Sequence, residues 1–444
     1  MNQNFMKEQK ILPLIAAMSL PMVISMAVNA LYNIVDSYFV AKISDDAMTA
    51  LSLVFPIQNM VNAIAIGFGI GVNACIAFFL GAEKKDKADM SASWGVLLSL
   101  LHGILLTVVC IAVMPAFLRV FTKEENILNL AISYSNRVFL FAAAVNVGIC
   151  YEKIFQAVGK MRVSMFSMMA GCVANIILDP LMIFGIGPFP AMGIQGAAYA
   201  TGIGQCLTLA VYLLLFWLRP IPVKVQPGYL KKEGILIGRL YRIGVPATLN
   251  TALPSVQISV LNQILSGFSG QYVLVLGIYY KLQTFIYLSA NGIVQGIRPL
   301  VGFNAGAGEK KRVQDIFRTS LFLIMGIMLV GTVIAWVCPV QLFSLFARDA
   351  EAIRMGAGAL RIISIGFVIS SVSVTCSGVL EGLGKGTASL WISLTRYIVL
   401  MLPLAFLFSR IFGAGGVWYA FAVTEWLAAA LSFFIWKRTR LVAE

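Results

Sequence analysis

The sequence predicts an all-α polytopic membrane protein with twelve transmembrane helices in two six-helix lobes, related by a pseudo-twofold axis along the membrane normal. Three observations predict this fold: the composition, a series of apolar runs, and an internal repeat. The composition excludes a soluble or disordered chain, because 59% of the 444 residues are hydrophobic and 12% are charged. Soluble domains have about 45–50% apolar and about 25% charged residues, which is enough polar surface to face water.

Each predicted helix is an apolar run long enough to cross a bilayer, which takes about 20 residues. Polar breaks separate the runs, and several of them contain glycine or proline. The longest connection lies at 219–236 and separates an N-lobe at 1–218 from a C-lobe at 237–444. The runs cover, in order, residues 11–41, 47–80, 91–121, 126–151, 160–187, 193–218, 237–266, 271–305, 313–346, 350–380, 386–412 and 415–437.

The net charge of +14 comes from 33 lysines and arginines against 19 acidic residues, and most of the basic residues lie in the connections. Counted on alternate sides of the predicted helices, 23 fall on the side of both termini, including Lys231 and Lys232, and six on the other side. Positive charge marks the cytoplasmic side. We therefore predict a multi-pass protein of the plasma membrane (a cell inner membrane) with both termini and the linker in the cytoplasm, and no nucleic-acid partner.

The two halves resemble each other at a shift of 225 residues. An even number of helices per repeat makes both halves enter the membrane from the same side, a parallel arrangement known from transporters. A duplication kept only for stability is the simpler alternative. The glycines in the repeat also allow helices to pack closely. The aligned pairs include Pro21 with Pro246, Gln58 with Gln283, Gly67 with Gly292, and Gly71 with Gly296.

Motifs for catalysis and for ATP hydrolysis are absent from the sequence. The segment from Gly382 to Thr387 lacks the spacing of a phosphate-binding loop, and a chain whose one histidine is His102 has no H-E-x-x-H zinc motif. The seven cysteines contain no C-x-x-C pair and are interpreted as small core residues. We therefore expect no enzyme, no cofactor and no obligate protein partner. Without ATP hydrolysis, any transport is driven by an ion gradient or by the concentration gradient of the substrate itself.

A candidate cation site lies inside the predicted helices of the N-lobe and consists of Asp36, Asn175, Asp179 and Thr201. Asn175 and Asp179 are one turn apart and share a helix face. At ~1.5 Å per residue, Asp36, Asp179 and Thr201 all lie about 8–12 Å from the outer helix ends. Their oxygens suit Na⁺, or one carboxyl holds a proton because of burial and a like-charged neighbour. Helix capping near Asp179 with a solvated Asp36 is the alternative.

The repeat supplies a control for this site, because all four counterparts in the C-lobe are apolar. The scaffold therefore does not need polar side chains at these positions for packing. The counterparts are Leu261, Leu400, Leu404 and Phe421.

Several segments resemble the MATE (multidrug and toxic compound extrusion) family of transporters, bacterial type. They are Asn175-Ile-Ile-Leu-Asp179-Pro180, Gly193-Ile-Gln-Gly196, Pro21 with Asp36, and Pro299-Leu-Val-Gly302-Phe-Asn304-Ala-Gly306. The resemblance implies two six-helix lobes, cation-coupled drug efflux, and a cation site in the first lobe, where all four candidate residues fall on matching positions.

The resemblance has one departure. Some MATE relatives carry acids in helices 7 and 10, whereas this chain has Pro254 in the first position and no acid between Glu351, at the start of the second helix, and Glu381. The loop from Gly81 to Asp89 also lacks the basic pattern of the major facilitator class, the principal rival family.

The C-lobe has a charge group of its own. Lys281, Arg396 and Glu425 each lie about ten residues from the nearest helix end, near the membrane midplane. An internal ion-pair group that holds the lobe together is the first interpretation. Recognition of substrate charge, or a second protonation site, is the alternative.

Matched stripes on the second and eighth predicted helices suggest a substrate cavity between the lobes. Aromatic and amide side chains suit amphipathic cations, and methionine makes a cavity permissive. An inter-lobe packing seam, with methionine as core filler, is the alternative. The predicted cavity residues are Met26, Phe55, Gln58, Asn62, Tyr280, Gln283 and Tyr287.

Together these observations predict an antiporter that exports amphipathic, mostly cationic organic compounds through the lipid membrane in exchange for H⁺ or Na⁺. A flippase for a lipid or lipid-linked saccharide is the main alternative, although its anionic substrate calls for a basic cavity. A channel or a membrane scaffold without transport is the third possibility.

Overall fold

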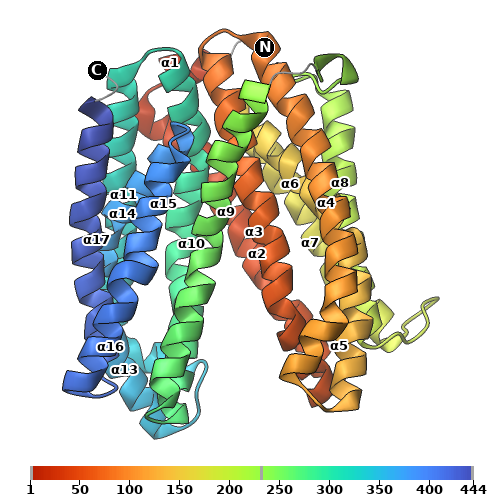
Figure 1. The fold of residues 1–444 in the computed structure, drawn as a ribbon, viewed down its shortest axis with the longest axis vertical. Coiled ribbons are helices and arrows are strands. Elements are labelled where there is room, and N and C mark those ends of the chain that lie inside the picture. The colour runs from red at the N-terminus through yellow and green to blue at the C-terminus, as the bar shows by residue number, and fades with distance from the viewer. Residues whose placement is uncertain (1–3, 231–233, 442–444) are drawn as a thin grey trace. The chain divides into compact units, whose positions relative to one another are not determined.

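The computed structural model describes residues 4–230 and 234–441, and within these ranges the regular structure is helical throughout, with no strand (Figure 1). This confirms the all-α prediction. Lys231 and Lys232, which contribute to the predicted charge asymmetry, lie outside the described residues.

The helices of the first half follow the predicted runs closely. They are α2 (Ile11–Ala41), α3 (Asp45–Gly81), α4 (Lys85–Phe121), α5 (Glu125–Val138) continued by η1 (Phe139–Phe141) and α6 (Ala142–Ala157), α7 (Met161–Phe184), and α8 (Ile194–Leu218). A short helix, α1 (Phe5–Glu8), precedes them, and a turn, η2 (Pro227–Tyr229), lies in the connection that follows.

The second half repeats this order. Its helices are α9 (Gly234–Ser266), α10 (Gly270–Gly306), α11 (Lys310–Val337), α13 (Ala350–Ser364) followed by α14 (Phe367–Gly382), α15 (Gly386–Leu394) continued by η3 (Thr395–Leu400) and α16 (Met401–Phe412), and α17 (Gly416–Leu441). The largest difference from prediction is in the run 313–346, where α11 ends at Val337 and a short helix, α12 (Pro339–Ser344), follows.

Most of these helices are long and apolar enough to cross a membrane. Among the described residues ten satisfy this test, and α13 with α14, bent by 56°, make an eleventh as one broken span. The remaining long helix, α9, has 33 residues but carries Asn250, Thr251 and Gln257 in its middle. Its length fits a twelfth span, and its polar residues explain why its hydropathy is lower.

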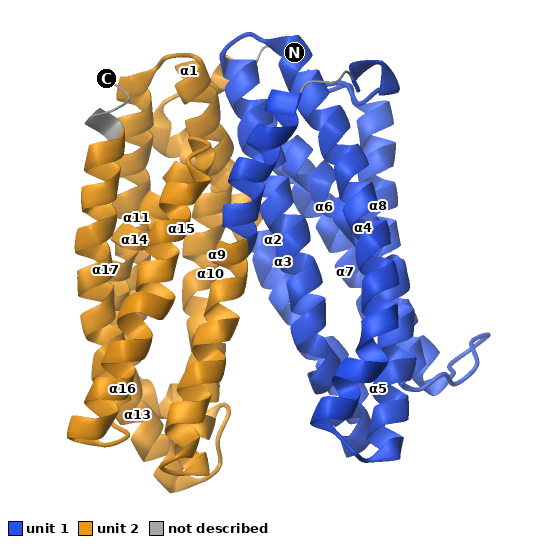
Figure 2. Ribbon diagram, viewed as in Figure 1, with its two compact units in different colours: residues 1–3, 24–248 blue, residues 4–23, 249–444 orange. Residues whose placement is uncertain are grey.

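The described chain forms two compact units (Figure 2), and their limits differ from those of the predicted lobes. Unit 1 contains residues 24–230 and 234–248, and unit 2 contains residues 4–23 and 249–441. The first part of α2 therefore belongs with the second half of the chain, and the first part of α9 belongs with the first half. The predicted lobes followed chain order, so they did not include this exchange of half-helices between the two units.

Glycines explain where the exchanged half-helices pack. A Cβ added to Gly292 of α10 would lie 2.9 Å from Cα of Val23, and one added to Gly67 of α3 would lie 2.4 Å from Cα of Thr248. These two contacts are equivalent under the shift of 225 residues, because Gly67 corresponds to Gly292 and Val23 to Thr248. Only glycine permits such close approach of two helix backbones. The close packing predicted from the repeat glycines is confirmed here.

The fourth helix of each repeat is broken at the same place. In unit 1 the break is η1, and in unit 2 it falls between α13 and α14. Thr107 Oγ1 donates to the carbonyl of Phe139 over 2.9 Å, and Thr332 Oγ1 donates to the carbonyl of Ser364 over 3.2 Å. Both threonines and both carbonyls are 225 residues apart. A hydroxyl of a neighbouring helix thus donates to a carbonyl next to each break, as side chains do at broken helices in lipid.

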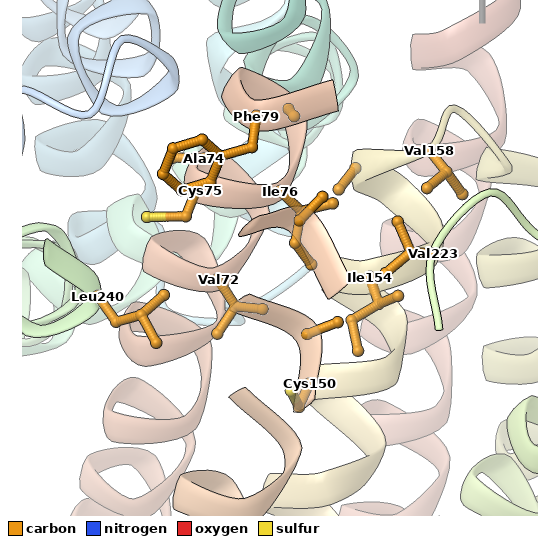
Figure 3. Packing of buried hydrophobic residues seen from close by; sticks show 14 of the residues in the cluster. Val72, Ala74, Cys75, Ile76, Phe79, Cys150, Ile154, Val158, Val223 and Leu240 are labelled. Carbon is orange, nitrogen blue, oxygen red and sulfur yellow. The ribbon is translucent and has the colours of Figure 1, made fainter. Parts of the chain in front are cut away.

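A cluster of buried apolar side chains forms part of the core of unit 1 (Figure 3). Val72 and Ile76 of α3 pack with Ile154 of α6 and Leu240 of α9, all almost fully buried. Cys150 lies in the same cluster, and all seven cysteines are free thiols. The interpretation of the cysteines as core residues is confirmed for the five that are buried, and Cys206 and Cys338 are half-buried.

Candidate functional site

The predicted cation site is assembled on two adjacent helices of unit 1. Asn175 Nδ2 of α7 donates to Asp179 Oδ1 over 3.3 Å and to Thr201 Oγ1 of α8 over 3.4 Å. The opposite orientation of the amide suits its neighbours better, since its nitrogen then donates to Asp179 Oδ2 over 3.2 Å and its oxygen accepts from the backbone N–H of Thr201 over 3.1 Å. In either orientation Asn175 links Asp179 to Thr201.

Asp36 of α2 completes the site from a third helix. Its carboxyl lies close to the Asp179 carboxyl, and Asp179 is fully buried. Two ionised carboxylates in a poorly solvated site repel each other, so a proton or a cation would stabilise this arrangement. Asp36 Oδ1 is buried, and the described part of the chain offers it no hydrogen-bond partner. The geometry therefore leaves one acidic oxygen available to a cation.

Two tyrosines lie near this carboxyl pair and were not singled out from the sequence. Tyr32 and Tyr134 are both within electrostatic range of Asp36 and Asp179. Tyr134 OH accepts a hydrogen bond from Gln58 Nε2 over 3.4 Å. The position of Tyr32, one turn before Asp36, was a usable signal because residues four apart share a helix face. Tyr134 lies on α5 and carried no such signal.

The chemistry of the site suits a small monovalent cation. Two carboxyls, one amide and one hydroxyl supply oxygen atoms only, and such groups bind H⁺ or Na⁺ in transporters. Among the described residues no group of three or more His, Cys, Asp or Glu side chains is arranged to hold a metal ion. The repeat counterparts of the site in unit 2 are packed as apolar side chains, with Leu261 and Phe421 buried.

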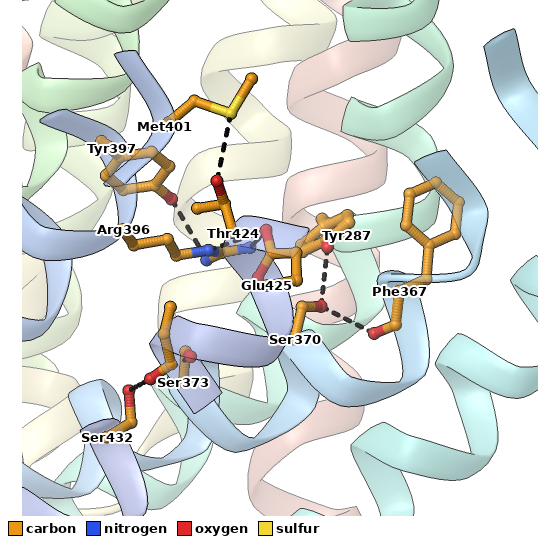
Figure 4. A network of polar contacts seen from close by, with 11 residues as sticks. Tyr287, Phe367, Ser370, Ser373, Arg396, Tyr397, Met401, Thr424, Glu425 and Ser432 are labelled. Carbon is orange, nitrogen blue, oxygen red and sulfur yellow. Dashed lines mark hydrogen bonds and ion pairs between the residues drawn. The ribbon is translucent and has the colours of Figure 1, made fainter. Parts of the chain in front are cut away.

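Of the predicted C-lobe charge group, the structure brings two members together. Arg396 donates from Nε and from one terminal nitrogen to Glu425 Oε1, over 2.9 Å and 2.7 Å (Figure 4). Lys281 is exposed, and its ammonium lies 5.7 Å from the centre of the Phe346 ring. Counting residues from helix ends does not reveal the helix face on which Lys281 lies.

The predicted cavity residues have different environments within their own units. Phe55 and Asn62 are exposed on α3, while Met26, Gln58 and Gln283 are half-buried. Tyr280 has a buried hydroxyl with no partner among the described residues. Tyr287 is buried, and its hydroxyl lies 2.7 Å from Ser370 Oγ inside unit 2. A shared substrate cavity stays a prediction, and Tyr287 contributes to the packing of its own unit.

A further buried charge pair was not predicted. Arg298 of α10 lies 2.6 Å from Glu381 Oε2 of α14, and Glu381 Oε1 accepts from Asn250 over 2.9 Å and from Ser389 over 3.2 Å. The repeat counterparts of Arg298 and Glu381 are Asn73 and Gln156. Matched polar residues at equivalent buried positions were the signal available in the sequence.

Long membrane-spanning helices, a twofold repeat and a buried acidic site define a multi-pass transport protein. The MatE family model matches residues 21–181 and again residues 246–407, so the two matches begin one repeat length apart. The chain belongs to the MatE family. It is a transporter and not an enzyme.

Characterised relatives and solved structures agree with this assignment. The chain is 25% identical over 418 residues to the multidrug export protein MepA of Staphylococcus saprophyticus, covering 94% of this chain and 91% of that protein. It is 25% identical over 432 residues to MepA of Staphylococcus haemolyticus. A crystal structure of MATE in complex with MaL6 matches 100% of the chain and 99% of its own with a TM-score of 0.94 at 23% identity, which shows the fold. A MOP superfamily transporter from Pyrococcus furiosus matches with a TM-score of 0.93 at 23% identity.

Proposed function

We propose that this transporter is a cation-coupled multidrug efflux antiporter of the plasma membrane, exporting amphipathic, mostly cationic organic compounds in exchange for H⁺ or Na⁺. The observation that carries the proposal is the closeness of Asp36 to the buried Asp179, which is linked through Asn175 to Thr201. Export of several drugs is supported by the relatives named multidrug export proteins. The acidic site supports a cationic substrate, because the substrate and the coupling cation then compete for the same negative charge.

The carboxyl pair provides a physical means of coupling. A bound cation neutralises the pair and lets Asp36 on α2 stay beside Asp179 on α7. When the cation leaves, two like charges in a poorly solvated site repel each other. Pro21 interrupts the hydrogen-bond ladder of α2 and allows this helix to bend. Coupling follows because the cation binds the two states of α2 with different affinity.

Transport of a fluorescent organic cation out of cells, or into everted vesicles, tests the proposal. We expect Asp36→Asn and Asp179→Asn each to lower gradient-driven transport at least about tenfold, since site ligands and their neighbours typically contribute that much affinity. Leu404→Asn, at the repeat counterpart of Asp179, is the matched control and retains transport. Full gradient-driven transport in both aspartate variants would show that the site is assigned wrongly.

The coupling ion is tested by imposing a proton gradient and a sodium gradient separately on proteoliposomes. The closeness of the two carboxyl groups favours a proton, because protonating one of them removes the repulsion between two like charges in a poorly solvated site. We therefore expect the proton gradient alone to drive efflux. Efflux that follows only the sodium gradient assigns the oxygen ligands of the site to Na⁺.

A further inference from the structure

Unit 2 contains a buried charge pair, Arg396 and Glu425, on the same two helices of its repeat that carry most of the candidate cation site in unit 1. Arg396 lies in η3, four residues before the repeat counterpart of Asn175. Glu425 lies in α17, four residues after the repeat counterpart of Thr201. Four residues make about one helical turn. The pair therefore lies one turn away from the level at which unit 1 has its cation site.

The contact is one-sided (Figure 4). Arg396 donates twice to Glu425 Oε1, while Glu425 Oε2 is buried and has no hydrogen-bond partner among the described residues. The side chains are 8% and 13% exposed. The Arg396 guanidinium also lies 5.2 Å from the Tyr397 ring centre and 6.0 Å from that of Tyr287. Glu425 is thus neutralised by a cation that is fixed to the chain, held by a carboxylate and two aromatic rings.

The helix around Arg396 is adapted to this side chain. Residues Thr395–Leu400 form a π-helix, whereas the counterpart helix α7 is continuous. π segments inside α-helices frequently occur at functional sites. The repeat counterpart of Arg396 is Gly171, where an added Cβ would lie 1.9 Å from Thr208 Oγ1. Unit 1 therefore has no room for an arginine at this level, whereas in unit 2 Arg396 lies in the π segment.

A purely structural brace does not require these charges. Replacing a buried ion pair with well-packed apolar residues is often neutral or stabilising, and charges inside a membrane are costly. The apolar counterparts of the cation site, Leu400 and Leu404, show that the helix carrying Arg396 tolerates such residues. The pair of Arg396 and Glu425 lies one turn from the residues equivalent to the cation site, and its charges therefore point to a role linked to ion binding.

We propose that Arg396 is a tethered cation that permanently takes the place of an exchangeable cation in unit 2, and that Glu425 is a latent H⁺ or Na⁺ site. This inference rests on the proposed ion-coupled function of unit 1. It follows that one buried acidic site per chain exchanges cations. Removing the arginine charge frees Glu425 to bind a cation from solution, because a buried unpaired carboxylate must take up a proton or a counter-ion.

Labelling with a hydrophobic carbodiimide tests the proposal on the intact protein, because this reagent modifies protonated carboxyl groups in apolar surroundings. In the native chain we expect Glu425 to stay unmodified, as read by mass spectrometry of peptides. In Arg396→Gln we expect Glu425 to be modified, and increasingly so as the pH falls. Arg396→Lys keeps a tethered charge and stays unmodified. The other titratable groups close to Glu425 are Tyr279, Tyr280 and Tyr287, and Tyr397 contacts Arg396.

Cation counting gives a second readout. In proteoliposomes, Arg396→Gln is expected to exchange more cations per substrate than the native chain, and Arg396→Gln with Glu425→Gln returns to the native ratio. Equal ratios in the single and double variants overturn the proposal, as does carbodiimide modification of Glu425 in the native chain. This second result overturns the proposal even when Arg396→Gln does not fold. Retention of transport by Asp179→Asn would overturn the proposed function alone and leaves the Glu425 labelling interpretable.

Discussion

Asn175 contacts both Asp179 and Thr201, and the scaffold accepts leucine at the equivalent position, as Leu400 shows. We predict that Asn175→Leu folds normally but lowers the affinity for the coupling cation about 10–100-fold, the usual cost of losing a group that orients an ion ligand. Substrate efflux measured against cation concentration gives the affinity, and thermal unfolding of the purified protein checks the fold. Leu400→Asn is the reciprocal control. Unchanged cation dependence in Asn175→Leu would remove Asn175 from the site.

Arg298 and Glu381 form a buried pair whose stability effect can be separated from transport. Arg298→Met leaves the Glu381 carboxylate, which is 4% exposed, without its cation. Such a loss costs about 3–5 kcal/mol of the free energy of unfolding. The exposed pair Lys7–Glu309 is the matched control, and Lys7→Met changes the stability by less than about 1 kcal/mol. Denaturant unfolding of the two purified variants measures both values, and equal losses would contradict the prediction.

Single residues show what sequence reasoning resolves. Asn175 and Asp179 were predicted together because helical periodicity fixes which residues share a face. The closeness of Asp36 to Asp179 was predicted from depth and from the apolar repeat counterparts. Depth did not place Lys281, because it says nothing about the direction in which a side chain points. The pairing of Arg298 with Glu381 depends on how two distant helices pack, which no local pattern encodes.

At the scale of elements, helix ends were predictable and helix interruptions were not. Hydrophobic runs end where polar and glycine residues begin, so α2 and α10 begin and end within one residue of prediction. The breaks at η1 and before α14 lie inside apolar sequence, and a threonine on another helix supports each one. Side chains from a neighbouring helix decide such breaks. The π-helix at η3 is a further case, since Arg396 and its distant partner Glu425 meet there.

The packing of α2 on α10 gives a prediction about elements. At Gly292 an added Cβ would meet the backbone of Val23 at 2.9 Å, whereas at Gly277 of the same helix nothing lies within 4 Å. We predict that Gly292→Ala destabilises the protein by about 1–3 kcal/mol, the usual cost of overpacking, and lowers efflux. Gly277→Ala is the control and is neutral or slightly stabilising because alanine favours helix. Thermal unfolding and efflux of both variants check this, and equal behaviour would contradict close packing at Gly292.

The whole molecule is a repeat whose two halves have equivalent folds and different chemistry. The sequence predicted the repeat because identities such as Gly67 with Gly292 survive without a gap. It did not predict that parts of α2 and α9 would belong to the opposite units, because chain order does not reveal which glycine a helix packs against. The chemical difference could be predicted from the sequence, since Asp36 and Asp179 of the first half correspond to Leu261 and Leu404 of the second. Unit 1 therefore has the candidate cation site, and unit 2 has apolar residues at the equivalent positions.

Membrane orientation is the last prediction, and it concerns the whole chain. Within unit 2, Asn304 at the end of α10 donates to the carbonyl of Met6, and Lys385 after α14 donates to that of Thr439. Arg298 joins the same ends of α10 and α14, so both chain ends lie at one end of unit 2. The positive connections predict that this end lies in the cytoplasm. We expect a fluorescent reporter at the C-terminus, or in the connection 158–160, to be shielded from external quencher, and one in the connection 122–124 to be accessible. The reverse pattern would invert the topology and turn the proposed efflux into uptake.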